Sequence, residues 1–291
     1  MVAMCRRDGE SLSEVGAEMK RIAVLMTCYN RVQTTLECLR RLFRQELPDG
    51  YALEVWLVDD ASPDRTGELV KAEFPQVNVI KSPGNLYWCR GMRLAWDRAA
   101  EAYDYDYYLW LNDDVQLKEK ALSAALRDAE KIGGMSPVVI VGTFSSDEQE
   151  RDVSYGATSD IPDGVSPKLA NGCFNGNFVL VPRQVFKRIG PICNLYHHAY
   201  GDYDYSWMLR RAGIDAYATS EFLGVCPQQP TRYIHLKGLK LAERIQTLFN
   251  PKGFSLHDTF VYRKRNWGGM RALISCIHVI VKVCWGKEAS A

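Results

Sequence analysis

The feature that most constrains the fold is a regular alternation in the first half of the chain. Short apolar runs lie at 22–26, 53–58, 77–81 and 107–111. Between them lie amphipathic stretches at 32–45, from the turn at 59–64 to residue 74, and at about 91–102. Each run is too short for a helix, and continuous apolar strands joined by helices are typical of a parallel sheet covered on both faces. Through about residue 141 the pattern therefore predicts the order βαβαβαβ, a doubly wound α/β sheet.

Each expected strand is followed by a cluster of polar residues, at 27–31, 59–64, 84–90 and 112–114. In a doubly wound sheet, ligands bind beyond the carboxyl ends of the strands, so the four clusters are expected at one edge. Asp, Asn, Gly and Pro are also ordinary turn residues, and the cluster at 59–64 is equally well explained as a turn. The pair Asp113 and Asp114 is harder to explain in this way, because adjacent carboxylates repel each other unless a cation or a donor lies nearby.

The second half is less regular. Residues 143–169 are polar and rich in turn residues, and the sequence NGCFNGN at 171–177 leads into an apolar run at 178–181. Its glycines and asparagines suit either a backbone held close to a ligand or a bulge. The segment at 197–213 contains a predicted helix that ends at Gly213. Asp202 and Asp204 are expected just before the start of that helix. An aspartate in this place is commonly a helix cap that contributes about 1 kcal/mol, so either carboxylate has that simple reading too.

The C-terminal region predicts two helices, at 236–249 and 271–285. In the second, Arg271, Ser275, His278 and Lys282 form one polar stripe on an otherwise apolar helix. Its apolar part is shorter than the roughly 20 residues that a bilayer span needs. A wide apolar face beside a cationic stripe suits a helix lying in the plane of a membrane surface. Burial against the domain or against a dimer partner explains the pattern equally well.

Composition excludes several classes of protein. The 291 residues carry 36 Lys and Arg against 35 Asp and Glu, a net charge of +1, which argues against a nucleic-acid partner bound by bulk charge. The nine cysteines are scattered without a CxxC pair, which is typical of free thiols in a reducing compartment. Residues 1–19 contain no apolar core of a signal peptide and are expected to be a polar extension. We therefore expect a cytoplasmic protein, at the inner face of the membrane if the last helix binds lipid.

Four motifs stand in order along the chain: TCYNR after the first expected strand, VDDASPD after the second, LNDD after the fourth, and GDYD before the late helix. Together they resemble the family-two inverting glycosyltransferases of the GT-A fold, and within that family the bacterial enzymes that build surface polysaccharide and O-antigen chains. The resemblance covers residues 20–240. It implies a Rossmann-like doubly wound mixed sheet, with a nucleotide-binding half at 20–115 and an acceptor half at 170–240. A helical region at 241–291 would follow as an extension.

The resemblance also implies roles for single residues. Thr27, Tyr29 and Arg31 would line the nucleotide pocket, Asp59 would accept a hydrogen bond from a pyrimidine base with Asp60 beside it, and Asp113 would face the ribose or the donor sugar. Asp114 would hold Mg²⁺ or Mn²⁺, Asp202 would be the general base, and His235 stands where some relatives place a ligand for the metal or the diphosphate. An isolated histidine of this kind also suits a purely structural role.

Three residues depart from the family pattern. Asn112 replaces the first aspartate of the DxD motif, which leaves metal binding mainly to Asp114 and the diphosphate. Gly201 precedes Asp202 where relatives carry a glutamate, and Met208 stands where many carry an arginine. These changes leave the expected base and the metal-facing carboxylate in place.

The implied reaction moves a sugar from a UDP- or dTDP-linked donor to a hydroxyl of a glycan or lipid-linked glycan, in surface polysaccharide synthesis. Inversion needs a general base and no protein nucleophile, and the sequence has no GxSxG elbow. A dehydrogenase would carry GxGxxG after the first strand and a P-loop enzyme GxxxxGK[ST]; neither motif occurs, nor does the glycine-rich loop expected of a nucleotidyltransferase. Because of Asn112, a catalytically silent GT-A-like scaffold subunit of a polysaccharide-assembly complex remains an alternative.

Overall fold

The computed structural model describes residues 19–134, 136–228, 236 and 238–285. The expected N-terminal extension, apart from Met19, and the expected ligand His235 lie outside these residues, as does the end of the chain after Trp285.

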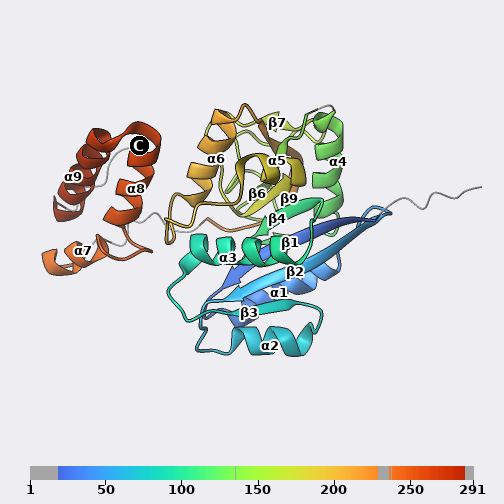
Figure 1. Cartoon of the computed structure of the whole chain (residues 1–291), viewed down its shortest axis with the longest axis horizontal. Helices are drawn as coiled ribbons and strands as arrows, with labels where there is room; N and C mark the ends of the chain where they lie inside the picture. The colour runs from blue at the N-terminus through green and yellow to red at the C-terminus, as the bar shows by residue number, and fades with distance from the viewer. Residues whose placement is uncertain (1–18, 135, 229–235, 237, 286–291) are drawn as a thin grey trace, which may run out of the picture.

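The first half of the chain forms the predicted alternation of strands and helices. In chain order the elements are β1 (Lys20–Cys28), α1 (Val32–Phe43), β2 (Tyr51–Asp59), α2 (Thr66–Glu73), β3 (Asn78–Lys81), α3 (Tyr87–Ala102) and β4 (Tyr107–Leu111). The strands β3, β2, β1 and β4 lie side by side and parallel, with Ile22 opposite both Leu53 and Tyr107. The carboxyl ends of all four strands therefore point to the same edge of the sheet (Figure 1).

The second half extends this sheet with mixed strand directions. It comprises β5 (Gln116–Leu117), α4 (Ala121–Gly133), β6 (Val139–Ser145), β7 (Lys168–Leu169), β8 (Phe178–Pro182), α5 (Arg183–Ile189), α6 (Gly201–Arg211) and β9 (Ala216–Val225). The strand β8 is antiparallel to both β4 and β6, and β9 runs parallel to β6. The strand order is β3-β2-β1-β4-β8-β6-β9-β5, with β7 on β9, which confirms the expected mixed α/β sheet.

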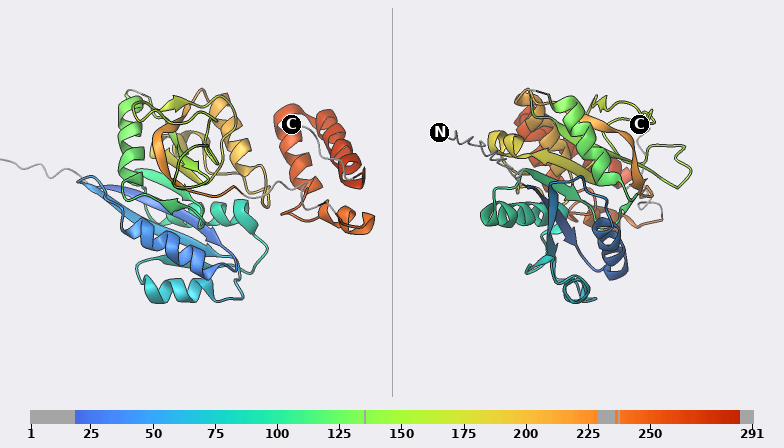
Figure 2. Two further views of the ribbon diagram at one scale, coloured as in Figure 1. Left: turned by 180° about the vertical axis from the view of Figure 1, so that it is seen from behind. Right: turned by 90° about the vertical axis from the view of Figure 1, so that its right-hand side faces the viewer.

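Helices cover both faces of the sheet (Figure 2), and apolar side chains form one buried layer on each face. Successive side chains of a strand point to opposite faces, so Val24 of β1 packs in one layer and Leu25 in the other. The first layer is closed by α1 and α4. The second is closed by α3 and α6 and is largely aromatic, with Trp96, Trp110 and Tyr205 fully buried. Both faces of β1 are covered, which explains its uninterrupted apolar sequence.

Three helices end the described chain: α7 (Leu241–Thr247), α8 (Leu256–Trp267) and α9 (Gly269–Trp285). The helix expected at 236–249 is shorter than predicted, because Lys240 caps α7 and its backbone N–H donates to Glu243 Oε2 at 2.7 Å. The pattern did not predict α8, which packs between α6 and α9 (Figure 1). No helix in the described part of the chain is long and apolar enough to cross a membrane.

Candidate functional site

A cavity of about 730 Å³ opens where the parallel strands end. Its walls come from the polar clusters that follow β1, β2, β3 and β4, so these clusters do meet at one edge of the sheet. The residues from these clusters and from the start of α3 are Thr27, Cys28, Tyr29, Arg31, Asp60, Ala61, Pro83, Gly84, Asn85, Tyr87, Trp88, Asn112, Asp113 and Asp114. Later parts of the chain add Tyr155, Asn177, His198, Asn250 and Lys252.

Arg31 holds the two adjacent carboxylates together. Its Nη1 donates to Asp113 Oδ1 at 2.9 Å and to Asp114 Oδ2 at 3.1 Å, and Thr35 Oγ1 donates to Asp113 Oδ2 at 2.9 Å. Asp113 is only 4% exposed. Burial raises the pKa of Asp113 to about 6, with Arg31 opposing the rise and Asp114 adding to it. The donor that the sequence argument required beside this pair is therefore Arg31.

The second carboxylate has an oxygen that suits a divalent cation. Asp114 Oδ1 is buried and has no hydrogen-bond partner among the described residues, although Asp114 lines the cavity. A buried polar atom without a partner is costly, and carboxylate oxygens are the ligands that Mg²⁺ and related ions prefer. Asn112 is otherwise engaged, because its Oδ1 accepts a hydrogen bond from Trp88 Nε1 at 2.7 Å. The residues present thus fit a cation held by Asp114 and not by Asn112.

The two aspartates after β2 have different surroundings. Asp59 accepts hydrogen bonds from the backbone N–H of Ser62 at 2.9 Å and of Gly67 at 3.1 Å, so it closes the turn before α2. Of the pair, only Asp60 lines the cavity. Its carboxylate accepts from Ser82 Oγ at 2.6 Å and from the backbone N–H of Tyr87 at 2.9 Å, which fixes the start of α3. The expected contact of Asp59 with a base does not match this arrangement, because its carboxylate is engaged in the turn while Asp60 faces the cavity.

Thr27 and Tyr29, for which the resemblance implies a place in a nucleotide pocket, both line the cavity. The ring of Tyr29 is about half exposed, and Lys252 Nζ lies 5.5 Å from its centroid. Asn250 and Lys252 come from the segment between α7 and α8, so the C-terminal region contributes to the cavity wall. Sequence reasoning missed both residues, because nothing in the local pattern connects that segment to the end of β1.

Asp202 lies in the first turn of α6 and is not among the described residues that line the cavity, but its bonding partner Gly176 directly precedes Asn177, which lines it. Its Oδ2 accepts from the backbone N–H of Gly176 at 3.1 Å, and its Oδ1 from that of Tyr203 at 2.9 Å. A Cβ on Gly176 would lie 2.6 Å from the Trp88 ring and 3.4 Å from Asp202 Cβ. The NGCFNGN segment therefore brings its backbone between the indole that bonds Asn112 and the expected base.

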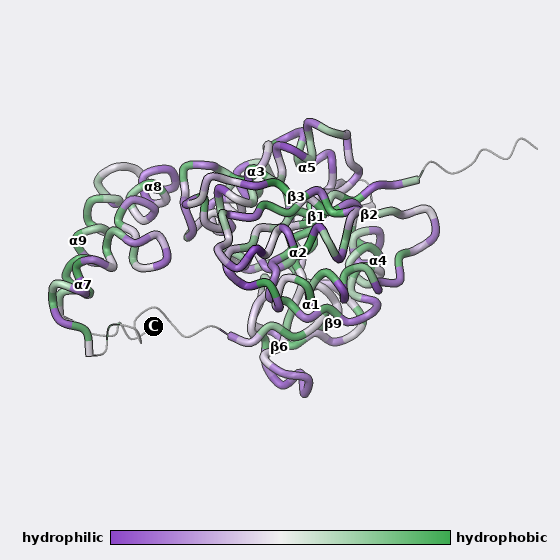
Figure 3. The backbone as a smooth tube through the Cα atoms, turned by 90° about the horizontal axis from the view of Figure 1, so that it is seen from below, coloured by the Kyte–Doolittle hydropathy of each residue, from purple (hydrophilic) through white to green (hydrophobic). Residues whose placement is uncertain are grey.

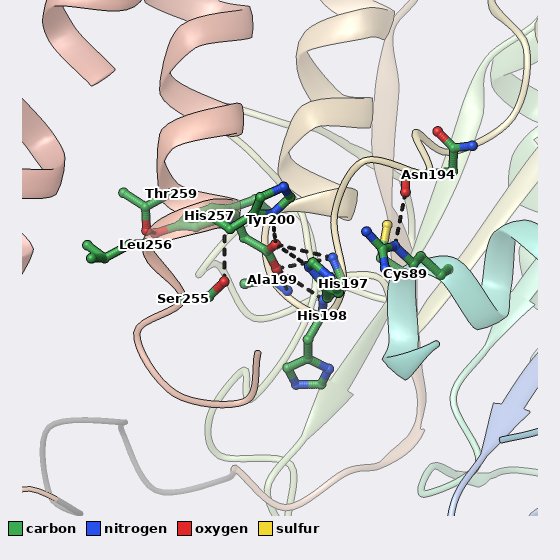
Figure 4. Close-up of polar contacts among 12 residues, drawn as sticks. Cys89, Asn194, His197, His198, Ala199, Tyr200, Ser255, Leu256, His257 and Thr259 are labelled. Atoms are coloured by element: carbon green, nitrogen blue, oxygen red, sulfur yellow. Dashed lines mark hydrogen bonds and ion pairs between the residues drawn. The ribbon is translucent and has the colours of Figure 1, made fainter. Parts of the chain in front are cut away.

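The loop that leads into α6 is held by a residue that the sequence did not single out. Asp258 of α8 is fully buried and accepts hydrogen bonds from the backbone N–H of His197 at 3.2 Å, of His198 at 3.1 Å and of Ala199 at 3.3 Å. Figure 4 labels these three residues together with His257, the neighbour of Asp258 in α8. The Nδ1 atoms of His197 and His257 each lie 3.0 Å from Asp258 Oδ1. Burial raises the pKa of Asp258, but hydrogen bonds from the two histidines and the backbone outweigh it, and the pKa is lowered.

A second contact joins α8 to α6. Asp204 is fully buried and forms an ion pair with Arg265, whose Nη2 lies 3.1 Å from Oδ2, and Asn266 Nδ2 donates to Oδ1 at 3.0 Å. Asp204, for which helix capping was one reading, therefore forms an ion pair between helices in which the carboxylate is buried and the guanidinium is partly exposed. The ring of Tyr200 also stacks on that of Tyr262, with centroids 4.6 Å apart. Through these contacts α8 fixes the segment that carries Asp202.

Comparison with known proteins places the fold. Residues 23–212 match the family model described as glycosyl transferase family 2. The mannosyltransferase PcManGT from Pyrobaculum calidifontis, solved with GDP-Man and Mn²⁺, is similar at 16% identity and a TM-score of 0.56, over 92% of this chain and 70% of that one.

The first 349 residues of S. aureus TarS, solved with UDP-GlcNAc, are similar at 12% identity and a TM-score of 0.53, over 91% of this chain and 82% of that one. No curated protein sequence matches the chain. The two structures share the GT-A fold with the sheet described above. Because the family model spans well over half of its length, the chain belongs to glycosyl transferase family 2 and is a glycosyltransferase.

Proposed function

We propose that this glycosyltransferase is a metal-dependent, inverting enzyme that moves a sugar from a nucleotide diphosphate sugar to a hydroxyl of a glycan or lipid-linked glycan. The observation that carries the proposal is the buried oxygen of Asp114, which lacks a hydrogen-bond partner within the described structure and belongs to the cavity wall at the sheet edge. Surface polysaccharide synthesis is the process to which the sequence resemblance assigns such an enzyme.

The residues around the cavity divide the work of donor binding. Asp114 would hold Mg²⁺ or Mn²⁺, while Arg31 fixes the orientation of both carboxylates. A cation there would neutralise charge that develops on the leaving diphosphate. Thr27, Tyr29 and Asp60 line the part of the cavity proposed for the nucleoside, and Asp60 takes the base-facing role expected of Asp59. Asp113 would act indirectly by orienting Arg31, because its two oxygens already accept hydrogen bonds from Arg31 and Thr35.

Asp202 is the proposed general base. An attacking hydroxyl must lose its proton as the new bond forms, and a carboxylate within about 3 Å of that hydroxyl contributes roughly 10²- to 10⁴-fold to the rate. The backbone N–H groups of Gly176 and Tyr203 each bond one oxygen of Asp202 and so set the plane of the carboxylate. Attack on the face of the sugar opposite the diphosphate inverts the anomeric centre without a covalent enzyme intermediate.

The identity of the nucleobase in the donor is tested by nucleotide binding. We would measure thermal unfolding with UDP, dTDP, GDP or CDP, each with Mn²⁺ or with EDTA, because a ligand at 100 times its Kd stabilises the folded state by about 2.7 kcal/mol. Stabilisation by UDP or dTDP that requires Mn²⁺ and disappears in Asp114→Asn is the expected result. Asp215→Asn, at an exposed position, is the matched control.

Catalysis is tested separately from binding. Asp202→Asn is expected to keep the Mn²⁺-dependent shift with the nucleotide and to lose turnover of the donor by at least 10²-fold. A nucleotide response in the wild type without any transfer or donor hydrolysis would contradict the enzymatic proposal. No response to any diphosphate would instead favour the scaffold alternative.

A further inference from the structure

The outward side of α9 is an exposed apolar face. Met270, Ile274, Ile277, Val281 and Trp285 recur at helical spacing, and Met270, Ile277 and Trp285 are 72%, 58% and 72% exposed. On the opposite side of the helix, Ala272 and Val283 are fully buried. Figures 1 and 3 show α9 at the outer end of the molecule, beyond α8 as seen from the sheet. Contiguous exposed apolar surface of this kind marks an interaction site.

The segment that carries this face is strongly cationic. Residues 240–285 contain eight Lys and Arg but only two Asp and Glu, a net charge of +6, whereas the whole chain carries +1. Of the two acidic residues, Asp258 is buried beneath His197 and His257. Like charges repel, so a second copy of this segment is a poor partner for the face. An apolar, anionic surface complements it, and a bilayer containing anionic phospholipid has both properties.

A groove of about 210 Å³ between α8 and α9 adjoins the apolar face. It is lined by Arg263, Trp267, Arg271, Ile274 and Ser275, and Ile274 belongs to both the groove and the face. Arg263 Nε is buried without a hydrogen-bond partner in the described part of the chain, and the guanidinium lies 4.9 Å from the centroid of Trp267. Guanidinium groups bind phosphate oxygens through directed N–H donors, so two arginines and a hydroxyl form a set of donors suited to a phosphate.

We propose that α9 docks on an anionic membrane surface, with its apolar face in the interfacial layer and a phospholipid phosphate in the groove between Arg263 and Arg271. The apolar face supplies the hydrophobic part of the affinity. The groove and the remaining basic residues of the segment, including Lys282 on the flank of α9, supply selectivity for anionic lipid. The enzyme's C-terminal helices thus hold it at the surface where lipid-linked glycans lie.

Vesicle sedimentation of the full chain tests this proposal. Vesicles of phosphatidylcholine alone are compared with vesicles that also contain phosphatidylglycerol, at low and high salt. We expect binding to the anionic vesicles that weakens with salt. Each of Arg263→Gln and Arg271→Gln is expected to lower the partition coefficient about fivefold, in line with one cation near an anionic surface. Ile277→Asp is expected to weaken binding to a greater extent.

Matched controls distinguish binding through the α8 and α9 residues from a general effect of positive charge. Arg98→Gln removes an exposed cation from α3, and it is expected to leave sedimentation unchanged. Circular dichroism melting checks that each variant folds, which is expected because Ile277 is exposed. Absence of sedimentation with anionic vesicles overturns the proposal. A concentration-dependent dimer that Ile277→Asp abolishes, in a protein that does not bind vesicles, overturns it too. Equal loss in Arg98→Gln and in the groove variants overturns the phosphate site.

Discussion

Replacing Asp258 with alanine is expected to disturb both the stability of the protein and its catalysis. The carboxylate is fully buried in α8 and accepts hydrogen bonds from three successive backbone N–H groups of the loop at 197–199. That loop runs directly into α6, in whose first turn Asp202 lies. Asp258 itself does not line the cavity, so it acts as a positioning residue for the proposed base.

The expected loss of unfolding free energy follows from the hydrogen-bonding groups that would lose their partner. A buried N–H left without an acceptor costs about 1–3 kcal/mol, and Asp258→Ala removes the acceptor of three backbone N–H groups, of which only that of Ala199 belongs to a buried residue. We therefore expect Asp258→Ala to lower the free energy of unfolding by about 3–5 kcal/mol. Asp258→Asn keeps one oxygen for the backbone donors, and its amide can donate to the histidine Nδ1 atoms in their other tautomer. We expect that variant to lose only about 1–2 kcal/mol.

The acid side of the stability profile gives an independent check. The pKa of Asp258 is lowered in the folded protein, so its contribution to stability is present above its unfolded pKa of about 3.9 and is lost as the pH falls through the folded value. The difference in unfolding free energy between wild type and Asp258→Asn is therefore expected to shrink as the pH falls below about 4. At neutral pH the difference is expected at its full size.

Urea denaturation at several pH values measures these differences, with Asp160→Ala, at an exposed position, as the control. Steady-state kinetics then separate positioning from binding: a small displacement of the base is expected to lower kcat by up to about 100-fold, while the Kd of the nucleotide changes much less, because His198 is the one residue of the loop at 197–199 that lines the cavity. Wild-type stability and wild-type kcat in Asp258→Ala would refute the reasoning. A raised nucleotide Kd with normal kcat would contradict the positioning role.

Three further substitutions test the contacts around the site. Gly176→Ala places a Cβ 2.6 Å from the Trp88 ring and is expected to cost about 1–3 kcal/mol in urea denaturation and to lower kcat, whereas unchanged values would show that the indole moves freely. Trp88→Phe removes the hydrogen bond to Asn112 and is expected to cost about 1 kcal/mol and to raise the donor KM; an unchanged KM would separate Asn112 from donor binding. Arg265→Met removes the cation beside the buried carboxylate of Asp204 and leaves it the amide of Asn266; because Arg265 is about one third exposed (34%), a loss of only about 1–3 kcal/mol is expected, and a neutral result would show that Asn266 alone suffices.

Of the first four strands, β1 and β4 were predictable because of how they are buried. A strand covered on both faces is apolar throughout, so β1 appears in the sequence as a continuous run that stops where polar turn residues begin. The same property placed the candidate cavity, since parallel strands carry their following turns to one edge. Which residue of a turn faces the cavity was not predictable. Asp59 and Asp60 are neighbours in the sequence, yet only the structure shows that the first bonds the turn and the second faces the cavity.

The helix α8 was not predictable from local pattern. Its buried residues include Asp258, Thr259 and Tyr262, and the two polar ones carry no apolar periodicity. Its place in the fold depends on partners far away in the sequence, such as the loop at 197–199 and Asp204. The same is true of Asn250 and Lys252 in the cavity wall. Contacts over such separations leave no local periodic trace in a single sequence.

These long-range contacts bear on the division of the chain at residue 240. The family model ends at residue 212, yet α8 supplies the carboxylate that holds the loop before α6 and the guanidinium that neutralises Asp204. The same helix packs against α9, whose outward face is apolar. A boundary at 240 therefore separates sequence patterns and does not separate functions. The last helices stabilise the segment that bears the proposed base, and a membrane bound at α9 would lie one helix away from it.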